Sequence, residues 1–127
     1  MNKLVILIAC VALPWLARPA MAQQQEAVAA LTDALKAHAP KGWEVRVRWR
    51  DGALLASITP WPYQEAFDLW YDTGKLVERM RALCPDQAQQ VWGLIAPSQD
   101  IVLEPTVGGK SAVEARVSCR AGRAIPL

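Results

Sequence analysis

The stretch 43-WEVRVRWRDGALLASIT-59 decides the fold of this chain. Its first half alternates strictly between apolar and charged side chains, which is typical of a half-buried β-strand. Asp51-Gly52 is the strongest short signal for a two-residue hairpin turn, and the apolar segment 53–59 follows it. We therefore expect an antiparallel hairpin in which Arg50 lies opposite Ala53.

This register divides the hairpin into an apolar face and a basic face. Arg46, Arg48 and Arg50 occupy alternate positions of one strand and form a row on the basic face. Guanidinium groups make forked hydrogen bonds to carboxylates and phosphates, so the row is a candidate recognition surface. The alternative is an ordinary solvated sheet face. The residues expected on the apolar face are Trp43, Val45, Val47, Trp49, Leu54, Ala56 and Ile58.

Helices are expected on both sides of this hairpin. Apolar residues recur at helical spacing in 23–39, and Pro40-Lys41-Gly42 ends that segment. A longer helix is expected over 62–83, where Gly74 interrupts the pattern and could split it. Segment 86–96 is ambiguous between a short helix and irregular chain, and we favour a helix.

A second hairpin is expected over 100–120. Apolar residues fall in one phase in 101–107 and again in 113–119. Both sets share a face only if the connecting loop has three residues, Gly108-Gly109-Lys110. Arg116 and Arg120 would then lie on the same face as the arginine row, and residues 121–127 would form a loose tail.

The predicted order is α-β-β-α-(α)-β-β. Strand pairs separated by helices favour an α+β fold with helices packed on one face of an antiparallel four-stranded sheet made of two hairpins. We expect a single domain over residues 23–120.

Residues 1–22 read as a secretory signal peptide. Lys3 precedes the apolar run 4–13, and Ala20-Met21-Ala22 forms a small-residue cleavage site. The run is shorter than the roughly 20 residues of a membrane-spanning helix, so we expect Gln23 to begin a periplasmic or secreted chain with no membrane span. Lipidation at Cys10 would leave an apolar segment on the mature protein, and an uncleaved anchor is disfavoured by Pro14 and Arg18.

Cysteine and charge content narrow the class further. Cys84 and Cys119 are the cysteines left after cleavage, and in an exported chain they predict one disulfide. The 14 basic residues include two in the leader, and the remaining 12 balance the 12 acidic residues. That balance argues against a nucleic-acid binder, which needs a strong positive field.

No catalytic motif stands out. The chain has one histidine, His38, at an expected helix end, and its Cys and His spacing matches no metal site. We therefore expect neither metal nor cofactor.

The leading hypothesis is a small exported binding or protein-interaction module, such as an accessory subunit or inhibitor, without catalysis of its own. Its partner would be a protein or an anionic group in the cell envelope, bound by Arg46, Arg48, Arg50 and Arg116. The alternative is a small periplasmic enzyme that uses scattered polar residues such as Asp68 and Tyr71 with the arginine row. An exposed aromatic or arginine patch would favour the module, and a deep polar pocket would favour the enzyme.

Overall fold

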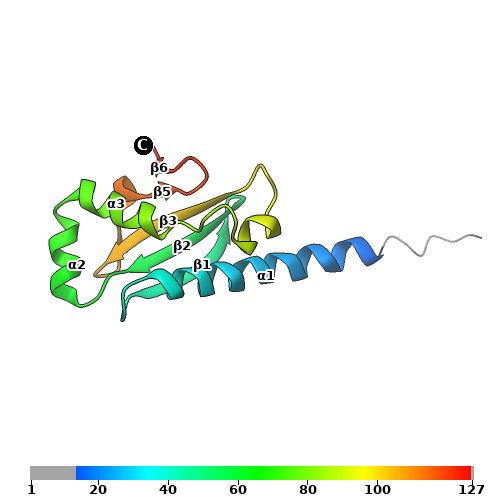
Figure 1. Ribbon diagram of the computed structural model, residues 1–127, viewed down its shortest axis with the longest axis horizontal. Helices are drawn as coiled ribbons and strands as arrows, with labels where there is room; N and C mark the ends of the chain where they lie inside the picture. Colours follow the sequence, from blue (N-terminus) through cyan, green and yellow to red (C-terminus); the bar gives the residue numbers. More distant parts are fainter. Residues whose placement is uncertain (1–13, 127) are drawn as a thin grey trace, which may run out of the picture.

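A mixed β-sheet with α-helices packed against one of its faces forms the body of the protein (Figure 1). The computed structural model describes residues 14–126, so the first part of the predicted signal peptide, residues 1–13, and residue 127 lie outside that range. Within it the helices are α1 (Pro14–His38), α2 (Tyr63–Trp70) and α3 (Thr73–Leu83), with 3-10 turns η1 (Gln90–Leu94) and η2 (Val113–Ala115). The strands are β1 (Glu44–Arg50), β2 (Ala53–Thr59), β3 (Asp100–Val107), β4 (Lys110–Ser111), β5 (Val117–Ser118) and β6 (Arg123–Ala124).

The first hairpin has the predicted register. β1 and β2 pair antiparallel from Glu44 opposite Thr59 to Arg50 opposite Ala53. Asp51 and Gly52 have φ values of 51° and 77°, as a two-residue turn of the mirror-image type requires. The strand alternation and the turn therefore agree, and the arginines of β1 fall on one face.

The predicted antiparallel arrangement of the whole sheet is wrong. β3 pairs with β2 in parallel, with Ala53 opposite Asp100 and Ile58 opposite Pro105, and the strand order is β1-β2-β3-β5-β6. The chain between β2 and β3 contains α2, α3 and η1, and it returns to the end of the sheet where β2 began. A connection of that length permits a parallel crossover, which a short turn does not.

The second hairpin also differs from the expected one. Gly108-Gly109 is a two-residue turn that pairs Val107 with Lys110, not the predicted three-residue loop. β4 is only two residues long and is followed by η2. β5 comes next and pairs antiparallel with β3, where Val117 lies opposite Leu103. η2 shifts the register between the two antiparallel strands by three residues. Val117 therefore lies on the core face beside Leu103 and is buried, whereas the register of the two-residue turn would have placed it on the opposite face.

Four other features were only partly predicted. Asp72 divides the expected helix 62–83, because its Oδ1 accepts the Lys75 backbone N–H at 3.1 Å and so caps α3. Segment 86–96 contains the short turn η1 rather than an α-helix. The tail is not wholly loose, because β6 within it pairs with β5. The first helix also begins earlier than expected, at Pro14.

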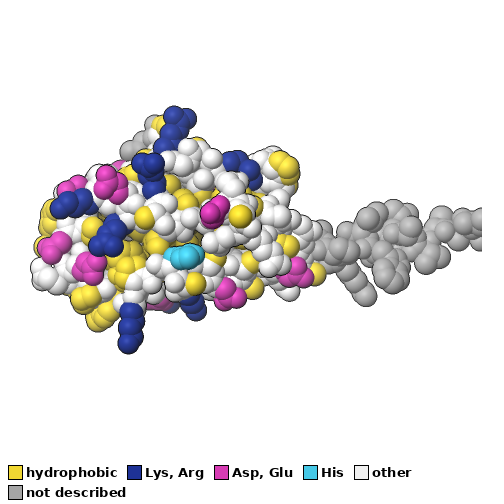
Figure 2. Space-filling model, viewed as in Figure 1, with side chains coloured by type: hydrophobic (Ala, Val, Ile, Leu, Met, Phe, Trp, Pro, Cys, Tyr) yellow, Lys and Arg dark blue, Asp and Glu magenta, His cyan; other side chains and the backbone are white. Residues whose placement is uncertain are grey.

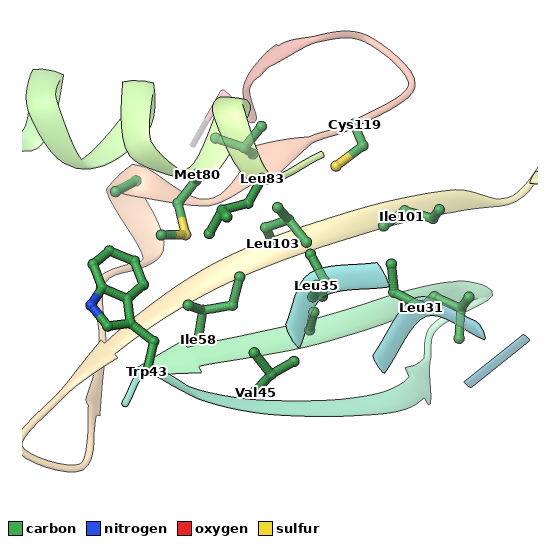
Figure 3. Packing of buried hydrophobic residues seen from close by; sticks show 14 of the residues in the cluster. Leu31, Leu35, Trp43, Val45, Ile58, Met80, Leu83, Ile101, Leu103 and Cys119 are labelled. Carbon is green, nitrogen blue, oxygen red and sulfur yellow. The ribbon is translucent and has the colours of Figure 1, made fainter. Parts of the chain in front are cut away.

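The core lies between the helices and the sheet (Figure 3). Leu31 and Leu35 of α1 and Met80 of α3 pack against Ile58 of β2 and Leu103 of β3, all without exposed surface. Burial of such side chains contributes about 1.5–3 kcal/mol each. The described helices therefore cover one face of the sheet, the face that carries Ile58 and Leu103.

A disulfide joins the end of α3 to the chain beyond β5. Cys84 and Cys119 are bonded, with their Cα atoms 5.4 Å apart, which confirms the predicted pair. Bonds of this kind form and persist in oxidising compartments. In the part of the chain that the structure describes, no helix combines the length and apolar character needed to cross a bilayer.

Candidate functional site

The face of the sheet turned away from the core carries the predicted arginine row. Arg46, Arg48 and Arg50 are all exposed, whereas Val45 on the opposite face of β1 is buried. In the register of β1 and β2, Arg48 lies opposite Leu55, and Leu55 lies opposite Val102 of β3. The outer face is therefore basic along β1 and apolar next to it.

A shallow hollow lies beside this row. Its volume is about 170 Å³, and Leu55 and Val102 line it, although each is less than one tenth exposed. The remaining lining residues are Arg50, Asp51, Ala53, Arg116 and Ile125. Pockets for small-molecule ligands usually measure about 300–1,000 Å³, so this hollow suits one side chain of a larger partner.

Arg116 borders the hollow but is already held by a buried carboxylate. Glu104 of β3 is only 3% exposed, and its Oε2 accepts hydrogen bonds from Nε and Nη2 of Arg116, the first at 2.8 Å. Burial by itself raises the pKa of Glu104. Hydrogen bonds from the Ser111 and Arg116 side chains and the nearby guanidinium charges outweigh burial, so its pKa is lowered from the ordinary value.

The arginines of β1 are held much more weakly. Arg46 Nε lies 2.8 Å from Glu44 Oε1, and Arg50 Nε lies 3.7 Å from Asp51 Oδ2, in pairs whose members are all more than half exposed. Exposed pairs of this kind are typically worth 0–1 kcal/mol. Arg48 has no ion pair within the described residues. The row on β1 can therefore exchange its present contacts for those of a ligand, unlike Arg116.

Arg120 does not extend the row as expected. Its guanidinium donates to the backbone carbonyl of Gln99 at 2.9 and 2.6 Å and lies 4.9 Å from the centre of the Trp92 ring. These contacts hold the loop before β3 against the turn after β5. Arg120 is therefore a structural residue.

The residues of the enzyme alternative are not gathered in one hollow. Asp68 lines an open hollow of about 480 Å³ between α2 and α3, but neither Tyr71 nor any arginine of the row does. Arg79 Nη2 lies there 3.4 Å from Glu65 Oε1. The Nε2 atom of His38 lies 3.4 Å from Nε2 of the Gln89 side chain. Among residues 14–126, no group of three or more His, Cys, Asp or Glu could hold a metal ion.

An aromatic ridge on α2 was missed in the sequence. Tyr63, Phe67 and Tyr71 are 58%, 41% and 74% exposed, and Trp61 just before the helix is 57% exposed. Phe67 packs edge-to-face on Tyr71, with ring centres 4.9 Å apart. Figure 2 shows hydrophobic side chains at the surface at the end of the molecule that α2 occupies. The four-residue spacing of these rings, out of phase with Ala66 and Leu69, was the available signal.

Comparisons with protein-family models, with curated proteins and with solved structures find no match for this chain. Its function is therefore argued from the surface chemistry just described.

Proposed function

We propose that this protein is a small binding module of the cell envelope that recognises an anionic group on a protein partner through the arginine row of β1, without catalysis of its own. The observation that carries the proposal is the placement of Arg46, Arg48 and Arg50. They stand at alternate positions on a sheet face that no helix of the described residues 14–126 covers, and within that range none forms an ion pair with a buried carboxylate. Guanidinium groups with weak internal contacts are suited to forked binding of carboxylate or phosphate.

The hollows favour a binding surface over an enzyme site. The hollow beside the row is small, and Leu55, Val102 and Ile125 are among the residues that line it. Arg50 also lines it, but Asp68 and Tyr71 of the enzyme alternative do not. An extended surface with one side-chain-sized hollow is typical of protein recognition, in which a few residues carry most of the binding energy.

A location outside the cytoplasm is proposed on two grounds. The signal-peptide pattern of residues 1–22 predicts export, and the Cys84–Cys119 disulfide suits an oxidising compartment. Cleavage before Gln23 would retain Ala27, Leu31 and Leu35, the residues of α1 that are buried in the core, and the Gln24 carbonyl that accepts the Trp49 Nε1 hydrogen bond at 3.1 Å.

The test is affinity capture from the envelope fraction of the source cells with the mature protein as bait. Replacing all three arginines of the row with Ser should abolish capture of the specific partner and leave the melting temperature within a few degrees of wild type, because exposed substitutions cost less than about 0.5 kcal/mol each. The matched control replaces Lys36, Lys41 and Lys75, which are also exposed, with Ser. If the arginine variant still captures the partner as well as the lysine control does, the binding site lies elsewhere.

A further inference from the structure

β1 forms an edge of the sheet. Among the described residues it pairs only with β2, and β3 continues the sheet on the far side of β2. Figure 3 shows β1 as the outermost of these three strands. An edge strand presents unpaired backbone N–H and C=O groups, which are a template for another strand.

The hairpin register determines which backbone groups face outward. In a two-residue hairpin the pair next to the turn, Arg50 and Ala53, exchanges hydrogen bonds, and every second pair along the strands does the same. The backbone groups of Arg46, Arg48 and Arg50 therefore point toward β2. Those of Val45, Val47 and Trp49 point away from the sheet.

We propose that the β1 edge binds an extended acidic segment of a partner protein as an added antiparallel strand, with carboxylates opposite Arg46 and Arg48. This rests on the proposed function and specifies how the row is used. An added antiparallel strand would hydrogen-bond to Val45, Val47 and Trp49, so the positions opposite the arginines would form the non-hydrogen-bonded pairs. Those pairs have Cα atoms about 4.5 Å apart and bring side chains closest together.

The opposite face of β1 indicates the rest of the pattern. Val47 and Trp49 are only half-buried, in contrast to Val45. Residues of the added strand that alternate with the acidic ones would lie beside these two side chains and cover them. The segment should therefore alternate acidic and apolar residues, complementing the basic and apolar alternation of β1.

A second copy of this chain does not fit the same edge. Antiparallel pairing of two β1 strands would bring one arginine row against another, and like charges on neighbouring strands destabilise a sheet. Positive charges on an edge also discourage unselective pairing, which is a common protective device. An acidic strand would instead be attracted to the arginine row. The row therefore disfavours basic or unrelated strands at this edge and favours acidic ones.

The probe is a fluorescent peptide, acetyl-Thr-Glu-Val-Glu-Val-Glu-Thr-amide, measured by anisotropy at low salt against the mature protein. In the proposed pairing its two Val amides face β1 and its Glu amides face solvent. N-methylation of the two Val residues should weaken binding at least tenfold. N-methylation of two Glu residues, the matched control, should change it less than threefold. Bound peptide should also slow amide hydrogen exchange at Val45 and Val47.

The outcomes separate this inference from the proposed function. If the Val-methylated peptide binds as well as the unmodified one, the arginines bind carboxylates without strand addition, and only the inference is overturned. If no peptide binds while the arginine variant still loses its partner in capture, the row recognises another anionic form and strand addition is again wrong. If capture is unaffected by loss of the row, both proposals fail.

A protein variant provides an independent check. Val47→Pro removes one outward N–H while leaving the arginines and the hydrogen bonds to β2 in place, and proline is tolerated at such edge positions. It should weaken binding of the unmodified peptide at least tenfold, whereas Val47→Thr should retain it. If the proline variant is misfolded by circular dichroism, the methylated peptides still decide the question.

Discussion

Replacing Arg116 by Met should destabilise the protein far more than the same change at Arg48. The replacement leaves the Glu104 carboxylate buried, with 3% of its surface exposed, and without its guanidinium partner. Breaking a buried ion pair from one side typically costs 3–5 kcal/mol. We expect about 3 kcal/mol, the lower end, because the Arg116 side chain is itself 31% exposed and partly solvated. Arg48→Met, at an exposed site, should cost less than about 0.5 kcal/mol.

The pH dependence gives the sign of the effect. The pKa of Glu104 is lowered in the folded protein, so the stability it contributes is present above its unfolded pKa of about 4.3 and is lost as pH falls through the folded value. In Arg116→Met the carboxylate becomes protonated more readily, which removes the buried charge. The free-energy difference between wild type and Arg116→Met should therefore be largest near pH 7 and shrink below about pH 4.

Urea unfolding of both variants at pH 7 and at the lowest pH where wild type stays folded measures this difference. The double variant Glu104→Met/Arg116→Met should be more stable than Arg116→Met alone at pH 7, since it removes the unpaired charge. A cost below about 1 kcal/mol at pH 7, or one that does not change with pH, would refute the assignment of a buried ion pair.

Three further outcomes are expected. Replacing both Cys84 and Cys119 by Ser should lower the free energy of unfolding by roughly 4 kcal/mol, the value that the chain-entropy model gives for a loop of about 36 residues. Urea unfolding without reductant measures this difference from wild type, and an unchanged free energy of unfolding would mean that the disulfide does not form. Trp43→Ala should cost about 3–5 kcal/mol, because the residue is only 7% exposed, and a melting temperature near wild type would contradict that packing. Intact mass of the exported protein should correspond to a chain that begins at Gln23, and a lipid-modified species beginning at Cys10 would overturn the cleavage assignment.

Local signals in the sequence predicted the first hairpin fully. Alternation along β1 and the Asp51-Gly52 turn both act between near neighbours, and they agree on one register. The parallel pairing of β3 could not be predicted in the same way. It depends on where the long connection through α2 and α3 returns, which is decided by packing between distant segments such as Met80 and Leu103.

The candidate site was predicted in part for the same reason. Exposure of Arg46, Arg48 and Arg50 follows from strand alternation, which is local. The engagement of Arg116 follows from the buried neighbour Glu104 on β3, and that neighbour depends on the register shift introduced by η2. The aromatic ridge on α2 was missed because it depends on which face of the helix each residue occupies. Phe67 follows the buried Ala66 by one residue and therefore faces solvent, although its side chain is apolar.

The position of β1 at the edge is itself a consequence of the crossover. β3 joins the sheet beside β2, in parallel, and this leaves the outer edge of the hairpin without a partner in the described chain. Had the second hairpin paired with β1, its strand would have occupied the backbone groups of Val45, Val47 and Trp49, and the arginine row could have bound only with its side chains. The alternation of β1 therefore buries one face during folding and leaves the other beside an open edge. The proposed strand addition requires both the charged arginine row and the open backbone edge. Each can be removed separately: substitution of Arg48 and its neighbouring arginines removes the charges, and Val47→Pro removes one outward N–H.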